Sequence, residues 1–367
     1  MVDISAGSRR APVMLMTGEF WAGSTGFGLA AGLRRLGWVV QEVDRGHYGA
    51  GRGRSLALRV ASRLSAKASV SAFQDKVRRE CGMLRPDALL SVKGVDLDRS
   101  LLQEVRADGV KTVMYYPDLA FNHPGVDESA FDCYDLFATT KTFQIDWLKQ
   151  RLGSGVVEHV PHGYVDEVHV PVCSPPNATY GTHDVLYAGN HSAYKQDWLE
   201  RLVRLNPGLD LAVMGNRWHA ALPAIHVPPT RYFGEMQGVP YAQAIGAARI
   251  NIAIHFGATN STWQDLVSTR TFEIPACRGF MLHIDNDEVR EYFEPGKEID
   301  VFSTPEELDD KIRFYLAHPD LREKMIERAY ARCVPRYGYA RRALEIHQAM
   351  IKHGLVDGGR FHDRGAP

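Results

Sequence analysis

The sequence of 367 residues predicts an α/β protein with two doubly wound, Rossmann-like domains. Short apolar runs rich in β-formers alternate with longer runs of helical period, which is typical of parallel sheets covered by helices on both faces. The alternation stops at the stretch 170–184, which is rich in Pro, Ser, Asn, Thr and Gly taken together and which we interpret as a linker, and then starts again. We therefore expect a first domain over 1–175 and a second over 176–335. In this interpretation a helix at 336–353 packs back on the first domain, and 354–367 form a polar tail.

The expected elements follow this alternation along both halves. In the first half, strands are predicted over 12–18, 38–44, 87–93, 111–117, 134–140 and 155–161, with helices over 26–36 and 71–84. In the second half, strands are predicted over 184–189, 209–215, 231–234, 250–255, 280–285 and 298–302, with helices near 195–205, 240–248, 305–317, 319–333 and 338–352. Two such domains facing across a cleft would surround it with the carboxyl ends of their strands, where ligands of parallel sheets bind. Helix N-termini at those ends favour phosphate, so a nucleotide-type ligand is expected.

Composition excludes several classes of protein. The net charge of −1 gives no global attraction to nucleic acid, so we expect no nucleic-acid partner. Five scattered cysteines without a C-x-x-C pair indicate a reducing cytoplasm rather than a disulfide scaffold or a zinc site. No stretch approaches the ~20 apolar residues of a membrane span. A cytoplasmic protein is therefore expected.

One motif, with the segments that follow it, reduces the number of functions to consider. Residues 268–280 read S-T-R-T-F-E-I-P-A-C-R-G-F, and an acid-rich turn, F-E-P-G-K-E and P-E-E-L follow in order. This set resembles the C-terminal domain of GT-B glycosyltransferases, most closely the CgeB-like, spore-maturation group with a family-4-like donor domain. The resemblance implies a nucleoside-diphosphate sugar, with a UDP-sugar favoured, bound by the second domain. It also implies an acceptor in the first domain, whether glycan, glycolipid, protein or metabolite.

Glu273 stands among apolar residues of this motif, where a carboxylate is costly to bury without a partner. The resemblance implies that Glu273 accepts hydrogen bonds from the ribose hydroxyls, and that Asp265, eight residues earlier, touches the donor sugar. The alternative is a structural ion pair between Glu273 and Arg270 one turn away. Because Pro275 is best tolerated in a first turn, the helix is expected to start near Phe272.

Two segments are candidates for the donor diphosphate. Ser268, Thr269 and Arg270 would combine backbone N–H groups with a guanidinium at a helix entrance. Gly189, Asn190 and Lys195 follow a strand, and Gly215 follows the next strand, near the nucleotide base. The alternative for the second segment is a simple turn with a solvated lysine.

The first domain offers candidates for the catalytic base. Glu19 lies in the glycine-rich loop 17–28, which is not G-x-G-x-x-G and so disfavours a nicotinamide cofactor. Asp118 and His123 follow another strand, although Asp118 after Pro is also a common turn residue. The acid pair in D-N-D at 285–287 suggests a metal, but it falls in the acid-rich turn of the motif, so no metal is expected.

The segment 52–79 carries eight basic residues and one acid. Leu56, Val60 and Leu64 share one face, so a basic amphipathic helix on the inner face of a membrane, a grip on an anionic acceptor and a half-buried solvated helix all stay open. The resemblance implies a glycosyltransferase that moves a sugar to an acceptor hydroxyl, with retention of the anomeric configuration and without a metal. A nucleotide-sugar epimerase of related fold and a non-catalytic carbohydrate- or surface-assembly protein are the alternatives.

Overall fold

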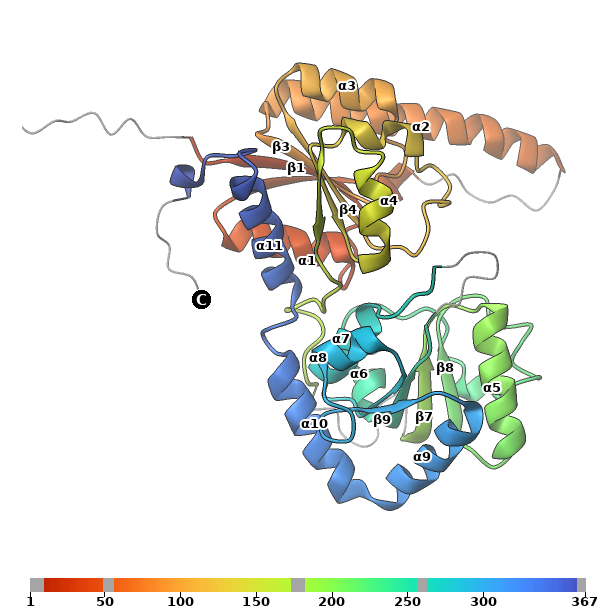
Figure 1. Ribbon diagram of the computed structural model, residues 1–367. Coiled ribbons are helices and arrows are strands. Elements are labelled where there is room, and N and C mark those ends of the chain that lie inside the picture. The colour runs from red at the N-terminus through yellow and green to blue at the C-terminus, as the bar shows by residue number, and fades with distance from the viewer. Residues whose placement is uncertain (1–9, 49–55, 173–181, 256–262, 362–367) are drawn as a thin grey trace, which may run out of the picture. The chain divides into compact units, whose positions relative to one another are not determined.

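The computed structural model describes residues 10–48, 56–172, 182–255 and 263–361 of the chain. The chain divides into two compact units (Figure 1). The first unit holds Met1–Pro161 together with Ala340–Pro367, and the second holds His162–Tyr339. This boundary falls earlier than the predicted division at 175/176, and most of the predicted linker lies outside the described residues.

Backbone hydrogen bonds explain the earlier boundary. Tyr164 forms an isolated parallel bridge with Gly338. The Tyr164 N–H donates to the Tyr337 carbonyl at 3.2 Å, and the Tyr339 N–H donates to the Tyr164 carbonyl at 2.8 Å. The residues that follow Pro161 are thereby tied to the end of the second unit.

The first unit contains a six-stranded parallel sheet in the order β2-β1-β3-β4-β5-β6. Its strands are β1 (Val13–Gly18), β2 (Val39–Asp44), β3 (Ala88–Val92), β4 (Lys111–Tyr116), β5 (Leu136–Thr139) and β6 (Val156–His159). All six strands predicted for this half are present. The order reverses between β1 and β3, and the carboxyl ends of strands at such a switch point form the usual ligand site of an open parallel sheet.

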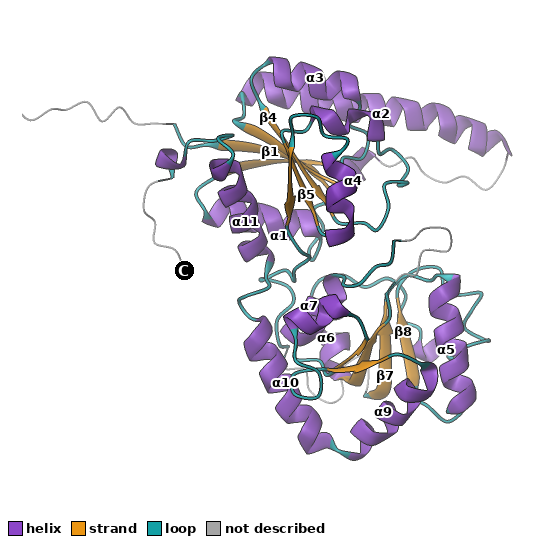
Figure 2. Ribbon diagram, in the orientation of Figure 1, coloured by secondary structure: helices purple, strands orange, loops and turns teal. Residues whose placement is uncertain are grey.

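Helices cover both faces of this sheet (Figure 2). They are α1 (Thr25–Arg35), α2 (Leu56–Leu84), α3 (Arg99–Ala107), α4 (Ile145–Lys149) and α11 (Tyr339–Lys352), with short 3-10 turns at Arg45–Tyr48, Glu128–Cys133, Thr142–Gln144 and Gly358–Arg360. The side chain of Ser24 caps α1 by accepting from the Phe27 N–H at 3.1 Å. The Trp38 indole N–H donates to Nδ1 of His347 at 3.3 Å, so α11 packs within the first unit.

Helix α2 contains most of the basic segment 52–79, and it begins at Leu56 rather than at the predicted residue 71. The side chains of 56–65 lie outside the described residues, so the predicted apolar face is untested. In the described part, Lys76 pairs with Glu80 at 2.5 Å and Arg78 pairs with Glu104 at 2.7 Å. Among the described helices, none combines the length and the apolar character that crossing a membrane requires. Membrane contact through this segment stays a prediction.

The second unit contains a five-stranded parallel sheet in the order β11-β10-β9-β7-β8. Its strands are β7 (His183–Ala188), β8 (Leu211–Met214), β9 (Ala248–Ala253), β10 (Met281–Ile284) and β11 (Asp300–Phe302). Its helices are α5 (Ala193–Leu205), α6 (Val239–Ala247), α7 (Thr269–Ala276), α8 (Asp287–Tyr292), α9 (Pro305–Ala317) and α10 (Pro319–Cys333), with a 3-10 turn at Pro229–Arg231. Along β7, Leu186 packs into the core on one face, and Tyr187 packs into the core on the other. The switch point of this sheet lies between β7 and β9.

One predicted strand, 231–234, is wrong. Tyr232 forms only an isolated bridge with Val213, and a 3-10 turn ends at Arg231 just before it. The Phe233 N–H still donates to the Val213 carbonyl at 3.0 Å. Aromatic residues gave this stretch the composition of a strand, but it only touches β8 and does not extend the ladder.

The predicted start of the helix that carries Glu273 is also wrong. Helix α7 begins at Thr269 rather than near Phe272, so Pro275 lies in its last turn rather than its first. A proline there removes one helical hydrogen bond, to the carbonyl four residues earlier. The helix ends at Ala276, so the missing N–H affects only its final turn.

The end of α7 is built by Arg278 together with Gly279. Arg278 has the left-handed φ of 56° that sequence analysis would assign to a glycine. The Gly279 N–H donates to the Ile274 carbonyl at 2.9 Å, which closes the turn. Gly279 is needed for space, because an added Cβ would lie 2.7 Å from Nδ2 of Asn251.

Candidate functional site

Two glycines bring the loops after β7 and β8 close together in the second unit. A Cβ on Gly215 would lie 2.2 Å from the carbonyl oxygen of Gly189, and the φ of 132° at Gly215 also favours glycine. The Asn190 side chain joins the same loops, since its Oδ1 accepts from the Asn216 N–H at 2.9 Å. Backbone therefore lines this edge of the sheet beside the switch point.

Lys195 projects from the first turn of α5 toward this edge. Its Nζ donates to the Asn190 carbonyl at 3.1 Å, and only 8% of the residue is exposed. Burial, and then the positive charge of Arg270, lower the pKa of Lys195 to about 8, while Asp265 acts in the opposite direction. The alternative of a solvated lysine is therefore wrong.

The start of α7 supplies the second group of candidates. Ser268 precedes the helix, and its N–H donates to Oγ1 of Thr271 at 3.2 Å. The Ser268 hydroxyl is buried and has no hydrogen-bond partner among the described residues. Arg270, in the first turn after Thr269, is half-buried and makes no hydrogen bond or ion pair with any described residue.

The structure brings these two groups together within the second unit. The pKa of the Arg270 guanidinium is raised overall. Burial alone would lower this pKa, but it is outweighed by four nearby groups, which are Tyr241, Tyr187, Glu273 and Asp265. The positive charge of Arg270 disfavours the charged form of Lys195 because like charges repel. Two cations therefore lie near each other, with Asp265 acting on both of them and Glu273 acting on Arg270.

Glu273 is buried, with 7% of the residue exposed. Its Oε2 accepts a hydrogen bond from the Tyr241 hydroxyl at 2.6 Å, and its Oε1 lies 4.0 Å from Nε2 of His169. The predicted alternative, an ion pair between Glu273 and Arg270, is wrong, because no such pair forms between these two described side chains. Oε1 accepts no hydrogen bond from the described residues.

His169 faces Glu273 in a defined tautomer. The Val165 N–H donates to Nδ1 of His169 at 2.9 Å, so this nitrogen is unprotonated and the proton of the neutral ring lies on Nε2. Burial lowers the pKa of His169, against the opposing effect of Glu273. The neutral ring thus turns an N–H toward the carboxylate.

Sequence reasoning missed five side chains of this region. Tyr241 and His169 surround Glu273, and no local pattern singles them out. The Tyr187 hydroxyl is buried beside Gly189 and has no hydrogen-bond partner among the described residues. His283 lies in β10, with its Nε2 2.7 Å from Nε2 of the buried His255. Burial lowers the pKa of His283 to about 4. The two histidines could have been noticed, because His255 ends one predicted apolar strand and His283 lies within another.

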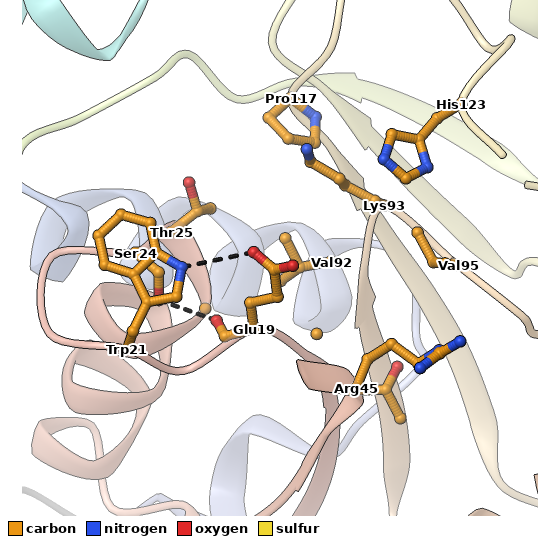
Figure 3. A pocket seen from close by; sticks show the side chains of 13 residues that line it. Glu19, Trp21, Ser24, Thr25, Arg45, Val92, Lys93, Val95, Pro117 and His123 are labelled. Atoms are coloured by element: carbon orange, nitrogen blue, oxygen red, sulfur yellow. Dashed lines mark hydrogen bonds between the residues drawn. The ribbon is translucent and has the colours of Figure 1, made fainter. Parts of the chain in front are cut away.

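The first unit holds a pocket of about 180 Å³ at its own switch point (Figure 3). Glu19 and His123 both line it, together with the start of α1. A Cβ on Gly26 would lie 2.5 Å from the Glu19 carbonyl oxygen, so the loop after β1 can fold back on the helix only with glycine there. Asp118 pairs with Lys93, another lining residue, at 3.0 Å. The structure therefore brings the three candidate catalytic groups of this unit to one place.

Three lining side chains were missed: Trp21, Arg45 and Lys93. Lys93 has a left-handed φ of 69°, a conformation that costs of order 1 kcal/mol for a residue with a Cβ and occurs often at functional sites. Arg45 pairs with Asp96 at 2.5 Å. Local patterns could not reveal these residues, since each reaches the pocket from a different strand end.

No group of His, Cys, Asp or Glu side chains that could hold a metal is found among the described residues. In the D-N-D stretch, Asp285 is engaged by Arg290 through two hydrogen bonds, of 2.8 and 2.7 Å. Asn286 caps α8 by accepting from the Val289 N–H at 2.9 Å. Asp285 and Asn286 therefore stabilise the start of α8.

Comparison with known proteins finds a family that matches part of the chain. Residues 193–348 match the family described as glycosyl transferase-like, which is less than half of the chain. None of the curated proteins compared with the chain matches it.

Solved structures resemble the whole chain. Sucrose-phosphate synthase from Thermosynechococcus elongatus has a TM-score of 0.63 at 13% identity, with 94% of this chain and 99% of that chain covered. Anabaena HepE, solved in complex with UDP and glucose, has a TM-score of 0.61 at 11% identity, with 94% and 100% covered. A UDP-N-acetylglucosamine 2-epimerase has a TM-score of 0.56 at 11% identity, with 95% and 98% covered. The chain therefore has the GT-B fold, and its residues 193–348 match the glycosyl transferase-like family.

Proposed function

We propose that the protein is a glycosyltransferase that moves a sugar from a nucleoside-diphosphate sugar, with UDP-sugars favoured, to an acceptor hydroxyl. The motif around Glu273 supports a place in the CgeB-like group with a family-4-like donor domain. Neighbours of the same fold include HepE, whose structure holds UDP and glucose. The reaction is proposed to retain the anomeric configuration and to need no metal.

The observation that carries this proposal is that two cations, Lys195 and Arg270, lie near each other. The positive charge of Arg270 disfavours the charged form of the buried Lys195, and a negative ligand would relieve this repulsion. Arg270 has no hydrogen bond or ion pair with the described residues, so its guanidinium is available for a bidentate contact. A diphosphate supplies the charge and the planar pairs of oxygens that such a guanidinium binds.

Two buried hydroxyls support the same site. The Tyr187 and Ser268 hydroxyls have no hydrogen-bond partner among the described residues, and burying such a group unpaired costs about 1–3 kcal/mol. Both can donate to an acceptor-only ligand. Phosphate oxygens are such a ligand, and the N-terminus of α7 favours them as well.

Glu273 is proposed to bind the ribose through Oε1. Because Tyr241 occupies only Oε2, the other oxygen can accept from a sugar hydroxyl. Asp265 is proposed to touch the donor sugar, and Gly189 and Gly215 to let the nucleotide approach the backbone. During the reaction, Lys195 and Arg270 would stabilise the departing diphosphate.

The first unit is proposed to bind the acceptor. Glu19 and His123 line its pocket, and Asp118 pairs with the lining Lys93. Any of the three is a candidate for proton removal from the acceptor hydroxyl, which requires a group within hydrogen-bond reach.

The proposal is tested first by ligand binding. A ligand that binds the native state raises the melting temperature, so UDP, GDP and TDP are compared on the wild type. Arg270→Gln and Glu273→Gln are expected to lose most of the response to the preferred nucleotide. Arg278→Gln is the matched control, since Arg278 lies just beyond the same helix and pairs with Glu327. No shift with any nucleotide would sink the donor site.

Turnover then separates the possible activities. Incubation with UDP-sugars and an acceptor mixture should release UDP, and should do so in the presence of EDTA. Conversion of UDP-N-acetylglucosamine to an isomer without an acceptor would instead indicate an epimerase. Nucleotide binding with neither reaction would indicate a non-catalytic protein.

A further inference from the structure

The pocket of the first unit combines an aromatic face with polar groups of both signs. In Figure 3 the Trp21 ring stands on one side of Glu19, and Lys93 and His123 stand on the other. Trp21 is 41% exposed, and its indole N–H reaches Oε2 of Glu19 at 3.4 Å, which orients the ring beside the carboxylate. An exposed indole fixed in this way offers a ligand a flat apolar surface.

The charges of the pocket do not favour an anion. Lys93 already pairs with Asp118 at 3.0 Å, and Arg45 pairs with Asp96 at 2.5 Å. Glu19 has no cationic partner among the described residues, so its charge is left over. A phosphate or carboxylate would therefore meet compensated cations and an opposing carboxylate.

The same groups suit a ligand with many hydroxyls. The Glu19 carboxylate accepts hydrogen bonds and the Lys93 ammonium donates them. Nδ1 of His123 donates to the Pro124 carbonyl at 2.9 Å, so Nε2 of the neutral ring is left as an acceptor. The face of an indole ring is electron-rich and attracts the slightly positive C–H groups on the flat side of a sugar ring. The volume of about 180 Å³ is below the ~300–1,000 Å³ of sites for drug-sized ligands, so it suits one small unit.

We infer that this pocket binds an uncharged sugar ring of the acceptor, stacked on Trp21 and hydrogen-bonded to Glu19 and Lys93. This inference rests on the proposed transferase function and names the class of its acceptor. The transferred group would be attached to a hydroxyl of this terminal sugar, so the acceptor is a glycan or glycoside rather than an anionic metabolite.

The test measures binding to the full chain without any turnover. Methyl glycosides of glucose, galactose and mannose are titrated into ¹⁵N-labelled protein, with and without UDP, while the indole N–H signal of Trp21 is followed. Trp21→Phe identifies that signal by removing it. Inorganic phosphate is the anionic probe, and a denaturation curve confirms that each variant is folded.

At least one glycoside is expected to shift the Trp21 signal, and phosphate is not. Saturation-transfer measurements should show roughly tenfold weaker binding to Trp21→Ala, which corresponds to the loss of an aromatic contact of about 1.4 kcal/mol. Trp21→Phe should keep most of the affinity, and the exposed Phe314→Ala in the second unit should keep all of it.

Three results would overturn the inference: no glycoside binds in either condition, glycosides bind Trp21→Ala as well as the wild type, or phosphate alone shifts the Trp21 signal. The same samples are titrated with UDP. Failure of UDP to bind would count against the proposed function. Binding of a glycoside at Trp21 in the same samples would still support a sugar site in the first unit.

Discussion

The Tyr241 hydroxyl donates a hydrogen bond of 2.6 Å to Oε2 of Glu273, and this contact joins α6 to α7 in the second unit. The sequence alone does not show what pairs with a carboxylate among so many apolar residues. The Tyr241 hydroxyl is that partner. Burial, and then the charge of Glu273, raise the pKa of the Tyr241 phenol well above its usual value. The phenol therefore stays a donor throughout the physiological range.

Removal of this hydroxyl should destabilise the protein. Tyr241→Phe leaves the buried carboxylate without the one side chain that donates to it among the described residues, and a hydrogen bond to a charged group contributes about 1.5–3 kcal/mol. A loss of this size in the free energy of unfolding is expected in denaturant titrations at pH 7.

Tyr194→Phe is the matched control. Tyr194 lies half-buried in α5, and its hydroxyl makes no hydrogen bond with the described residues. Its substitution should change the free energy of unfolding by less than about 0.5 kcal/mol. Equal effects of the two substitutions would show that the contact with Glu273 contributes nothing.

Nucleotide binding should be coupled to protonation of Lys195. Its pKa is lowered to about 8 in the free protein, and a bound diphosphate would raise it again. Binding of UDP at pH 8.5 should therefore take up protons, and the affinity should fall as the pH rises above 8. Calorimetry in buffers of different ionisation enthalpy measures this uptake.

Lys195→Met should abolish the extra proton uptake at pH 8.5 and flatten the pH dependence of affinity above 8. At pH 7 the wild-type lysine is already mostly protonated, so the uptake there should be smaller. Proton uptake that is unchanged in Lys195→Met would place the titrating group elsewhere.

The same lysine should make the free protein less stable at neutral pH. Its folded pKa of about 8 lies below its ordinary value of 10.5. Below pH 8 both states are protonated, and the folded state carries the full cost of a buried charge. Between pH 8 and 10.5 the unfolded chain binds more protons, so stability rises with pH through that window.

Lys195→Met should therefore stabilise the protein at pH 7, by up to roughly 3 kcal/mol, and the gain should shrink toward pH 10.5. Denaturation curves from pH 7 to 10 measure the difference. Lys324→Met, on the exposed side of α10, should give no comparable gain. Lys195→Met could instead be less stable than the wild type at pH 7. That result would mean that interactions of the ammonium group outweigh the free-energy cost of burying its charge.

The close approach of two loops should make Gly215 intolerant of a side chain. Gly215→Ala places a Cβ against the Gly189 carbonyl and requires a φ that alanine disfavours, so a cost of more than about 2 kcal/mol and weaker UDP binding are expected. Gly208→Ala is the control, because no atom lies within 4 Å of its added Cβ. Comparable stability of the two variants would show that the loops can separate freely.

Local patterns were sufficient for most elements of the fold. Helices α9 and α10 have the bounds expected from the sequence, because Thr304 caps the first and a proline opens each. The alternation of buried strands and amphipathic helices likewise repeats at short range, so the parallel sheets were predictable. Where a local signal was ambiguous, as in the aromatic stretch 231–234, the prediction failed.

The partners of the candidate residues depend on contacts between distant parts of the chain. The motif predicted the importance of Glu273, but Tyr241 and His169 reach it from other segments through the packing of the second unit. Trp21, Lys93 and His123 meet in one pocket because parallel strands end at the same edge of a sheet. Periodicity along the chain records which residues are buried, whereas the identity of a neighbour is set by how helices and strands pack. Many sequences with the same periodicity would therefore form this fold, and the packed structure selects which side chains meet at its two candidate sites.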